Sequence, residues 1–244
     1  MEKRHELALV VGVGPGLGFS LARRFARAEM QIALAARHPE KLDDIAAECS
    51  GIGHGCAALR CDASVEADVV GLFDRVGREF GDPHLVVYNA GAFTQGSVLD
   101  TSAEAFERAW RTGCLGGFLV GREAARRMRA RVAAGGPGGT ILFTGATASL
   151  RGAAGFHCLA VAKAGLRALA QSMARELQPS GIHVAHVVID GRIRPQPGVE
   201  HGAPDHGDAL LDADAIAETY YQLHRQPRSA WTLELDLRPW VEKF

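Results

Sequence analysis

Short apolar runs alternate along the chain with longer segments whose apolar positions recur at helical spacing. The first run, residues 7–11, reads LALVV, and Leu17, Leu21 and Phe25 then follow at intervals of about one helical turn. Continuous apolar runs of this length are typical of strands buried on both faces, and the second pattern is typical of amphipathic helices. The alternation predicts an α/β protein whose doubly wound, seven-stranded parallel sheet has helices on both faces, in three layers.

The expected elements follow from these patterns and from the turn residues between them. Strands are expected at residues 7–11, 31–36, 56–61, 85–88, 140–144, 182–189 and 232–237, and helices at about 17–28, 38–48, 65–80, 102–131, 154–177 and 213–224. Residues 194–207 are rich in Pro, Gly and His without periodicity, so we expect a substrate loop at about 194–212. The length of 244 residues and the lack of repeats predict one domain spanning 1–244.

Charge and cysteine usage argue against several classes of function. The formal net charge of -1 provides no basic field for nucleic acid or for an anionic membrane. No apolar run approaches the length of a membrane span, and the N-terminal MEKRHE is no signal segment. The five cysteines form no CxxC pair and no metal-ligand spacing, so we expect reduced thiols, no bound metal and a cytoplasmic location.

Closely spaced glycines separate the first strand from the first helix, where a dinucleotide phosphate would bind. Gly12 can adopt a backbone conformation closed to other residues, Gly16 has no Cβ to block a pyrophosphate, and Gly18 allows close packing of helix and sheet. Pro15 and Leu17 belong to the same turn. The free N–H groups and the positive dipole end of the helix would face the anion. Glycine-rich turns also serve only to reverse a chain, but the order of strand, turn and helix favours dinucleotide binding.

Three further motifs stand after the later strands. Asp62 follows the third strand, Asn89-Ala90-Gly91 the fourth, and Lys163 lies in the helix after the fifth. Together with the glycines, these motifs resemble the short-chain dehydrogenase/reductase family, in order and over nearly the whole chain. The resemblance implies that Asp62, with Ala63 beside it, contacts the adenine. It implies that Asn89, Ala90 and Gly91 support the sheet and the adenine-side ribose, that Lys163 holds the nicotinamide ribose, and that Ile193 contacts the cofactor.

Self-association is also implied by the resemblance, as a homodimer or homotetramer through the helices after the fourth and fifth strands. Apolar residues available for such a face are Ala124, Ala125, Leu166, Leu169 and Ala170. The same residues would serve equally well for packing on the sheet, so the pattern alone leaves both interpretations open.

The choice of cofactor depends on the end of the second strand. An acidic residue there would bind the adenosine ribose and repel a 2′-phosphate, but the chain has Ala36 followed by Arg37. A guanidinium can bind a phosphate with two parallel charge-assisted hydrogen bonds, and Lys41 would add charge. The sequence therefore favours NADP(H) over NAD(H).

At the catalytic positions the chain departs from the family. The family's tyrosine, which passes a proton to the substrate oxygen, stands one turn before the lysine, where this chain has Leu159. Alignment places Ala146 at the position of the serine that orients this oxygen and Cys114 at the position of the asparagine. Of the family's four proton-handling residues, this chain retains only Lys163.

Several other side chains are candidates to replace the missing proton-handling residues. Thr147 lies beside Ala146, but a threonine hydroxyl is a poor acid. An imidazole is a common proton donor in catalysis, yet His157 precedes Lys163 by six residues and would lie about 120° around the helix from it. Further candidates are Thr94, Thr144, Ser149, Tyr220 and Tyr221.

Two hypotheses result. The first is a divergent NADP(H)-dependent oxidoreductase with a non-standard proton route, in which Leu159, Ala146 and Phe156 would suit an apolar, activated small-molecule substrate. The second is a dinucleotide-binding protein without turnover, acting as a redox sensor or as the inactive partner in an oligomer. We favour the first because Lys163, whose expected ribose contact matters mainly near the nicotinamide, is present.

Overall fold

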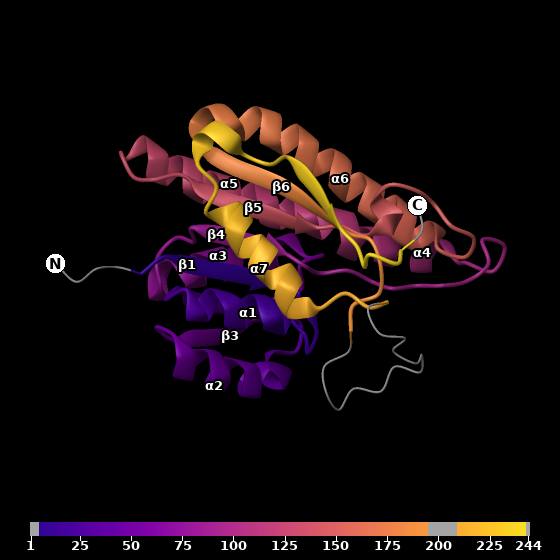
Figure 1. Ribbon diagram of the computed structural model, residues 1–244, viewed down its shortest axis with the longest axis horizontal. Coiled ribbons are helices and arrows are strands. Elements are labelled where there is room, and N and C mark those ends of the chain that lie inside the picture. Colours follow the sequence, from indigo (N-terminus) through magenta and orange to yellow (C-terminus); the bar gives the residue numbers. More distant parts are fainter. Residues whose placement is uncertain (1–4, 195–208, 243–244) are drawn as a thin grey trace.

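The computed structural model describes residues 5–194 and 209–242 and contains one sheet of seven parallel strands (Figure 1). The strands are β1 (Leu7–Val11), β2 (Gln31–Ala36), β3 (Cys56–Arg60), β4 (Leu85–Tyr88), β5 (Gly139–Thr144), β6 (Ile182–Ile189) and β7 (Glu234–Leu237). Their order is β3-β2-β1-β4-β5-β6-β7, and every neighbouring pair is parallel. The predicted doubly wound α/β fold is therefore confirmed.

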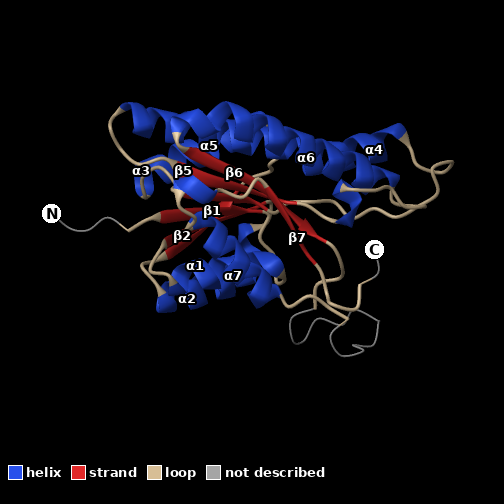
Figure 2. Cartoon of the chain, turned by 45° about the horizontal axis from the view of Figure 1, so that its top comes forward, coloured by secondary structure: helices blue, strands red, loops and turns tan. Residues whose placement is uncertain are grey.

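Helices cover both faces of the sheet (Figure 2). They are α1 (Leu17–Arg27), α2 (Asp43–Ile52), α3 (Glu66–Glu79), α4 (Ala103–Trp110), α5 (Gly116–Ala133), α6 (His157–Leu177) and α7 (Ala213–His224). Apolar residues of α1, α2 and α7 form a core on one face of the sheet, and those of α3, α5 and α6 form a core on the other. Within residues 5–194 and 209–242, no helix is both long and apolar enough to cross a membrane. Most of the expected substrate loop, residues 195–208, lies outside the described part of the chain.

Several element boundaries differ from the prediction. The expected helix at 38–48 is a 3-10 turn, Pro39–Leu42, followed by α2. The helix expected from residue 154 starts at His157, because Gly155 takes a left-handed conformation (φ +80°) that ends the preceding loop. The expected strand at 232–237 is shortened to β7.

The helix expected from about residue 102 and the long helix that it leads into, expected through residue 131, are joined by a π-helical turn, Arg111–Leu115, between α4 and α5. The turn lies where the chain passes close to its neighbours. A Cβ on Gly113 would lie 2.6 Å from Cβ of Ala162, and one on Gly116 would lie 2.3 Å from the hydroxyl of Tyr88. That hydroxyl donates a hydrogen bond to the carbonyl of Thr112. The break therefore follows from tertiary packing, which helical spacing along the sequence does not reveal.

The expected association face is used inside the chain. Ala124, Leu166 and Ala170 are fully buried, and Ala125 is nearly so, in the core formed by α3, α5 and α6. Leu169 is only partly buried. Of the two interpretations left open by the sequence, packing on the sheet is therefore the one that the structure adopts for these four residues.

One close approach shapes the edge of the sheet where the strands end. Gly12 follows β1 with a φ of +90°, and its N–H donates to the carbonyl of Ala35 at 2.9 Å. The side-chain amide of Asn89, which follows β4, donates to the Gly12 carbonyl at 2.9 Å. A Cβ on Gly12 would lie 2.3 Å from the backbone nitrogen of Ala90. The turn after β1 thus fits against the turn after β4 only if residue 12 is glycine.

We predict that Gly12→Ala lowers the free energy of unfolding by roughly 2–4 kcal/mol, because backbone strain and a backbone clash add. Urea denaturation would measure this. Gly14→Ala is the matched control, since a Cβ there meets no atom within 4 Å, and its effect should stay within about 0.5 kcal/mol. Equal effects of the two substitutions would contradict the packing role of Gly12.

Candidate functional site

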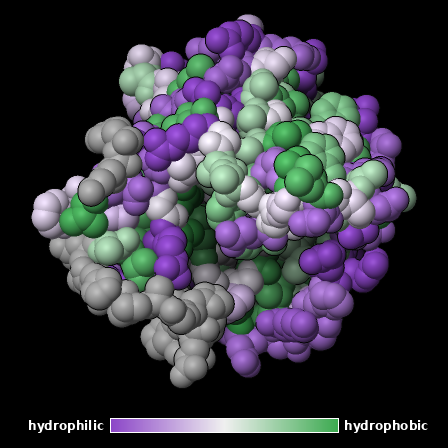
Figure 3. All heavy atoms as spheres, turned by 90° about the vertical axis from the view of Figure 1, so that its right-hand side faces the viewer, coloured by the Kyte–Doolittle hydropathy of each residue, from purple (hydrophilic) through white to green (hydrophobic). Residues whose placement is uncertain are grey.

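A cavity of about 480 Å³ lies at the carboxyl edge of β1 to β4. Figure 3 faces this edge of the molecule, where a hollow with apolar surface opens. The cavity contains most residues expected to bind a dinucleotide, namely Gly12, Pro15, Gly16, Leu17, Gly18, Arg37, Asp62, Ala63, Asn89, Ala90 and Gly91. Lys163 and Ile193 are not among its described lining residues. Side chains far apart in the sequence thus meet at one edge of the sheet, as ligand sites of open parallel sheets do.

The glycine turn presents an open surface to this cavity. A Cβ on Gly14 or Gly16 would meet no protein atom within 4 Å, whereas one on Gly18 would lie 2.8 Å from Cα of Val13. Gly18 therefore allows the close contact between helix and turn, as expected. Helix α1 has no side-chain cap at Gly16 and no acidic residue in its first turn. Its N-terminal N–H groups and positive dipole end are available to an anion.

Asp62 lies in the cavity wall in a fixed orientation. One carboxylate oxygen accepts hydrogen bonds from the backbone N–H of Ser64 at 3.0 Å and from its hydroxyl at 2.7 Å. Burial opposes ionisation, but the Ser64 hydrogen bonds and the charge of Arg37 outweigh it and hold the pKa of Asp62 below its ordinary value. The carboxylate is therefore ionised at neutral pH and can accept a hydrogen bond from a ligand N–H.

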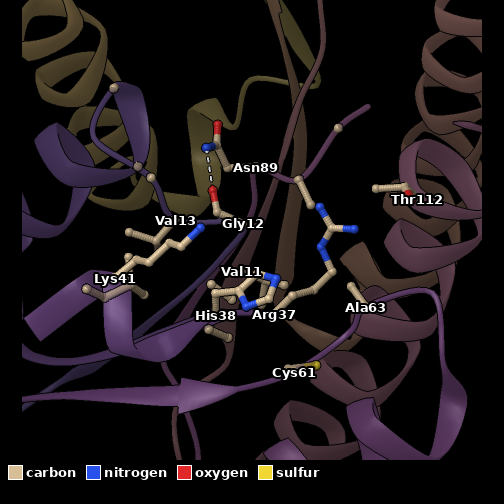
Figure 4. A pocket seen from close by; sticks show the side chains of 18 of the residues that line it. Val11, Gly12, Val13, Arg37, His38, Lys41, Cys61, Ala63, Asn89 and Thr112 are labelled. Atoms are coloured by element: carbon tan, nitrogen blue, oxygen red, sulfur yellow. Dashed lines mark hydrogen bonds between the residues drawn. The ribbon is translucent and has the colours of Figure 1, made fainter. Parts of the chain in front are cut away.

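Two cations line the cavity at the end of β2 (Figure 4). Arg37 extends toward the side of Thr112, while Lys41 and His38 lie on the other side. Within the described residues, neither Arg37 nor Lys41 has a side-chain hydrogen bond or ion pair, whereas His38 contacts Glu40 at 3.1 Å. Arg37 and Lys41 therefore present guanidinium and ammonium donors to the cavity that no described side chain occupies.

Some lining residues were missed by the sequence analysis. His38, Leu42, Cys61 and Thr112 also border the cavity. Cys61 directly precedes Asp62, so its place in the site follows from chain adjacency. Thr112 belongs to the π-helical turn between α4 and α5. No local sequence pattern predicts that this turn borders the cavity at the carboxyl edge of the sheet.

Lys163 is buried on α6 beside the cavity. Its ammonium donates to the carbonyl of Thr144 at 2.7 Å and would lie 3.5 Å from a Cβ on Gly91. Burial lowers the pKa of Lys163 from 10.5 to about 8. Leu159, half-buried, precedes the lysine by one helical turn. The lysine thus points toward the cavity edge with an apolar residue one turn away.

The candidate replacements are occupied by other contacts. The Thr147 hydroxyl donates to Asp190 at 2.6 Å. His157, the first residue of α6, contacts the Thr101 hydroxyl through Nε2 at 2.9 Å. Tyr220 is fully buried on α7 and donates to the Thr144 hydroxyl at 2.9 Å.

Two further positions named from the sequence, Cys114 and Ile193, also pack against other parts of the chain. Cys114 lies in the π-helical turn, and its sulfur would be 2.8 Å from a Cβ on Gly165. Burial raises the pKa of this thiol. Ile193 pairs with Leu211 in a single parallel bridge and packs on the core beneath α1 and α7.

A polar network that the sequence did not reveal runs beneath Ala146. The Ser149 hydroxyl accepts from the Ala146 N–H at 3.1 Å and contacts His186 Nε2 at 3.3 Å. His186 Nδ1 lies 3.1 Å from Glu234, which binds Arg167 through two bonds of 2.7 Å. Burial lowers the pKa of His186 to about 4, so its ring is neutral at pH 7. The network holds the turn after β5 in place.

Two aromatic rings pack together between the loop after β4 and the loop before α6. Phe93, 74% exposed, follows β4 and meets Phe156 edge to face with 5.7 Å between ring centroids. The Gly96 N–H donates to the Gly155 carbonyl at 3.0 Å. The two loops that carry these rings are thereby joined.

Comparisons with known proteins agree with this geometry. The family model described as "short chain dehydrogenase" matches residues 6–192. A short-chain dehydrogenase/reductase of Armillaria gallica is 31% identical over 180 residues, 73% of this chain and 67% of that protein. The (21S)-21-acetoxyl-apo-melianone synthase of Melia azedarach is 30% identical over 73% of this chain and 64% of its own length. The chain thus spans about two thirds of the length of these curated relatives.

Solved structures extend the similarity to nearly the whole chain. A short-chain dehydrogenase from Rhodopseudomonas palustris is 37% identical and superposes with a TM-score of 0.82, over 98% of this chain and 100% of that chain. An alcohol dehydrogenase from Thermococcus sibiricus, complexed with 5-hydroxy-NADP, shares the fold with a TM-score of 0.85 over 98% of both chains at 24% identity. Because the family model covers residues 6–192, the chain, with its glycine turn and Asn89 around one cavity and Lys163 beside it, belongs to the short-chain dehydrogenase/reductase family.

Proposed function

We propose that the protein is an NADP(H)-dependent oxidoreductase of small molecules. The observation that carries the proposal is the cavity at the carboxyl edge, where an open glycine turn faces Arg37 and Lys41. The uncapped N-terminus of α1 would bind the pyrophosphate. Arg37 and Lys41 would bind the 2′-phosphate. Lys163 would contact the nicotinamide ribose near Gly91, and Ile193 would complete the nicotinamide side.

We propose further that proton transfer follows a route other than the family's tyrosine. Leu159 and Ala146 carry no group that can donate a proton, and Cys114 is a partly buried thiol whose pKa is raised by burial. Lys163, with a pKa of about 8, is the nearby group best matched to neutral pH. Thr147, bonded to Asp190, and His157 are the weaker candidates. The exposed ring of Phe93, packed on Phe156 in the loop before the helix of Lys163, favours an apolar substrate.

The alternative is a dinucleotide-binding protein without turnover, as a redox sensor or an inactive oligomer partner. It is favoured by one observation: Tyr220, Thr147 and His157 all donate to or contact protein groups instead of projecting toward the lysine. A cytoplasmic homodimer or homotetramer of a single domain, with a substrate loop near 194–212, accompanies both proposals. Phe118, Leu169 and Met173, which line a groove between α5 and α6, would contribute to the interface.

Replacing Arg37 with Ala tests the cofactor. We expect the affinity for NADPH to fall about ten- to hundredfold, because a charge-assisted pair of hydrogen bonds is lost, with little change for NADH. Calorimetric titration of both nucleotides would measure this. Arg78→Ala, an exposed arginine on α3, is the control and should leave both affinities unchanged. Equal losses for NADPH and NADH in Arg37→Ala would contradict the assignment of Arg37 to the 2′-phosphate.

Leu159→Tyr tests the proton route. With a phenol one turn from Lys163, NADPH oxidation by a panel of aldehydes and ketones should rise by ~10²-fold over wild type, the lower range for a general acid. Leu159→Phe adds the ring without the hydroxyl and should not show this gain. If wild type shows no turnover while Leu159→Tyr does, the alternative of a binding protein is favoured. Equal rates for the Tyr and Phe variants would contradict the idea that an acid is missing at this position.

The buried lysine also predicts a pH dependence of stability. Between pH 8 and 10.5 the unfolded chain holds the Lys163 proton while the folded chain has released it, so folding stability rises with pH in this window. Relative to Lys163→Met, wild type should gain on the order of 3 kcal/mol across it. Urea unfolding of both proteins at several pH values would measure the difference. A difference that does not vary with pH would contradict the burial of a titrating lysine.

A further inference from the structure

A second cavity, of about 400 Å³, adjoins the dinucleotide cavity. We call it the arginine cavity, and its walls are Arg37, Asp62, Ser64, Ala92, Thr94, Ala105, Arg108, Arg111 and Thr112. The two cavities share Arg37, Asp62 and Thr112. Arg37 therefore stands in the partition between them, and its guanidinium, which points toward the side of Thr112 (Figure 4), is within reach of a group in either.

Helix α4 and the turn that follows it supply the other two arginines. Ala105 and Arg108 lie on neighbouring turns of α4, Arg111 opens the π-helical turn that follows, and all three border this cavity. Ala105 leaves room in front of the helix because its side chain is short. The Arg111 guanidinium donates to the Ser64 carbonyl and to Glu107, each at 3.4 Å. These two contacts hold Arg111 over the cavity from the β3 side.

The charges around the arginine cavity do not balance. Its only lining carboxylate, among the described residues, is Asp62, which already accepts two hydrogen bonds from Ser64. Arg111 has the long contact with Glu107, and Arg108 has the charge of Glu104 one turn away. Neither Arg37 nor Arg108 forms a side-chain hydrogen bond or ion pair with any described residue. The guanidiniums of Arg37 and Arg108 thus line the arginine cavity with hydrogen-bond donors that no described residue uses.

We propose that the arginine cavity binds a dianionic phosphate group through Arg37, Arg108 and Arg111. A phosphate carries about two negative charges at neutral pH and three acceptor oxygens, which matches planar guanidinium forks. The phosphate has two possible sources. One is the 2′-phosphate of NADP(H); this assignment rests on the proposed function and adds Arg108 and Arg111 to the residues that determine cofactor specificity. The other is a free phosphate bound beside the cofactor.

The test uses the double variant Arg108→Ala/Arg111→Ala, with inorganic phosphate, NADPH and NADH as probes in calorimetric titrations. The matched control is Arg75→Ala/Arg78→Ala, which removes an arginine pair of the same spacing from the exposed face of α3. Thermal melting would establish that both double variants fold. We expect the first to bind phosphate at least about tenfold more weakly than wild type, and the control to match wild type.

The nucleotide arms identify the source of the phosphate. A fall of about tenfold for NADPH without a change for NADH assigns the cavity to the cofactor's 2′-phosphate. Unchanged affinity for both nucleotides, with phosphate binding lost, assigns it to a free phosphate. The proposal is overturned if the double variant keeps wild-type affinity for phosphate and for NADPH. If wild type binds neither nucleotide, the proposed function fails. The phosphate titration still tests, independently, whether the arginine cavity binds phosphate.

Discussion

The close approach of two backbone turns, one after β1 and one after β4, is the constraint on which the rest of the site depends. Gly12 has no Cβ, so the Ala90 backbone can lie against it, and the Asn89 amide then bonds the Gly12 carbonyl. This contact joins the ends of neighbouring strands at the point where the sheet order reverses direction. A wider separation would open the dinucleotide cavity to the core beneath it. The glycine turn is thus as much a packing requirement as a surface for a phosphate.

Polar groups at the carboxyl edge are positioned at a cost in stability. Lys163 is buried with the Thr144 carbonyl as its hydrogen-bond acceptor, and burial of a cation is unfavourable unless it is compensated. Such a group is expected at a binding site, because a perturbed pKa and an unsatisfied charge are useful to a ligand. The same buried lysine would serve the proposed ribose contact and the proposed proton transfer. Both proposed functions, an oxidoreductase and a binding protein without turnover, therefore involve the same group.

The turn after β5 is stabilised from below by groups that never reach the cavity. Ser149, His186, Glu234 and Arg167 connect the Ala146 N–H to the edge strand β7. A neutral histidine between a hydroxyl and a carboxylate can accept from the first and donate to the second. The network therefore satisfies buried polar atoms without placing a net charge in the core. It maintains the backbone geometry of a turn whose own side chain, at Ala146, is a methyl group.

Hydrophobic periodicity determined the sheet, the order of its elements and the glycine turn, because strands and helices bury their apolar faces at fixed repeats that are visible along the chain. Asp62, Asn89 and Lys163 could be placed for the same reason, since each directly follows a strand or lies in the helix after one. Only the tertiary structure decided that Thr112 borders the cavity beside the glycine turn, that Arg108 and Arg111 line one cavity with Arg37, and that Ala124 and Leu166 pack inward. These contacts join residues from different elements. Their distances depend on how closely helices pack, and a break such as the π-helical turn arises from neighbours that the local sequence does not contain.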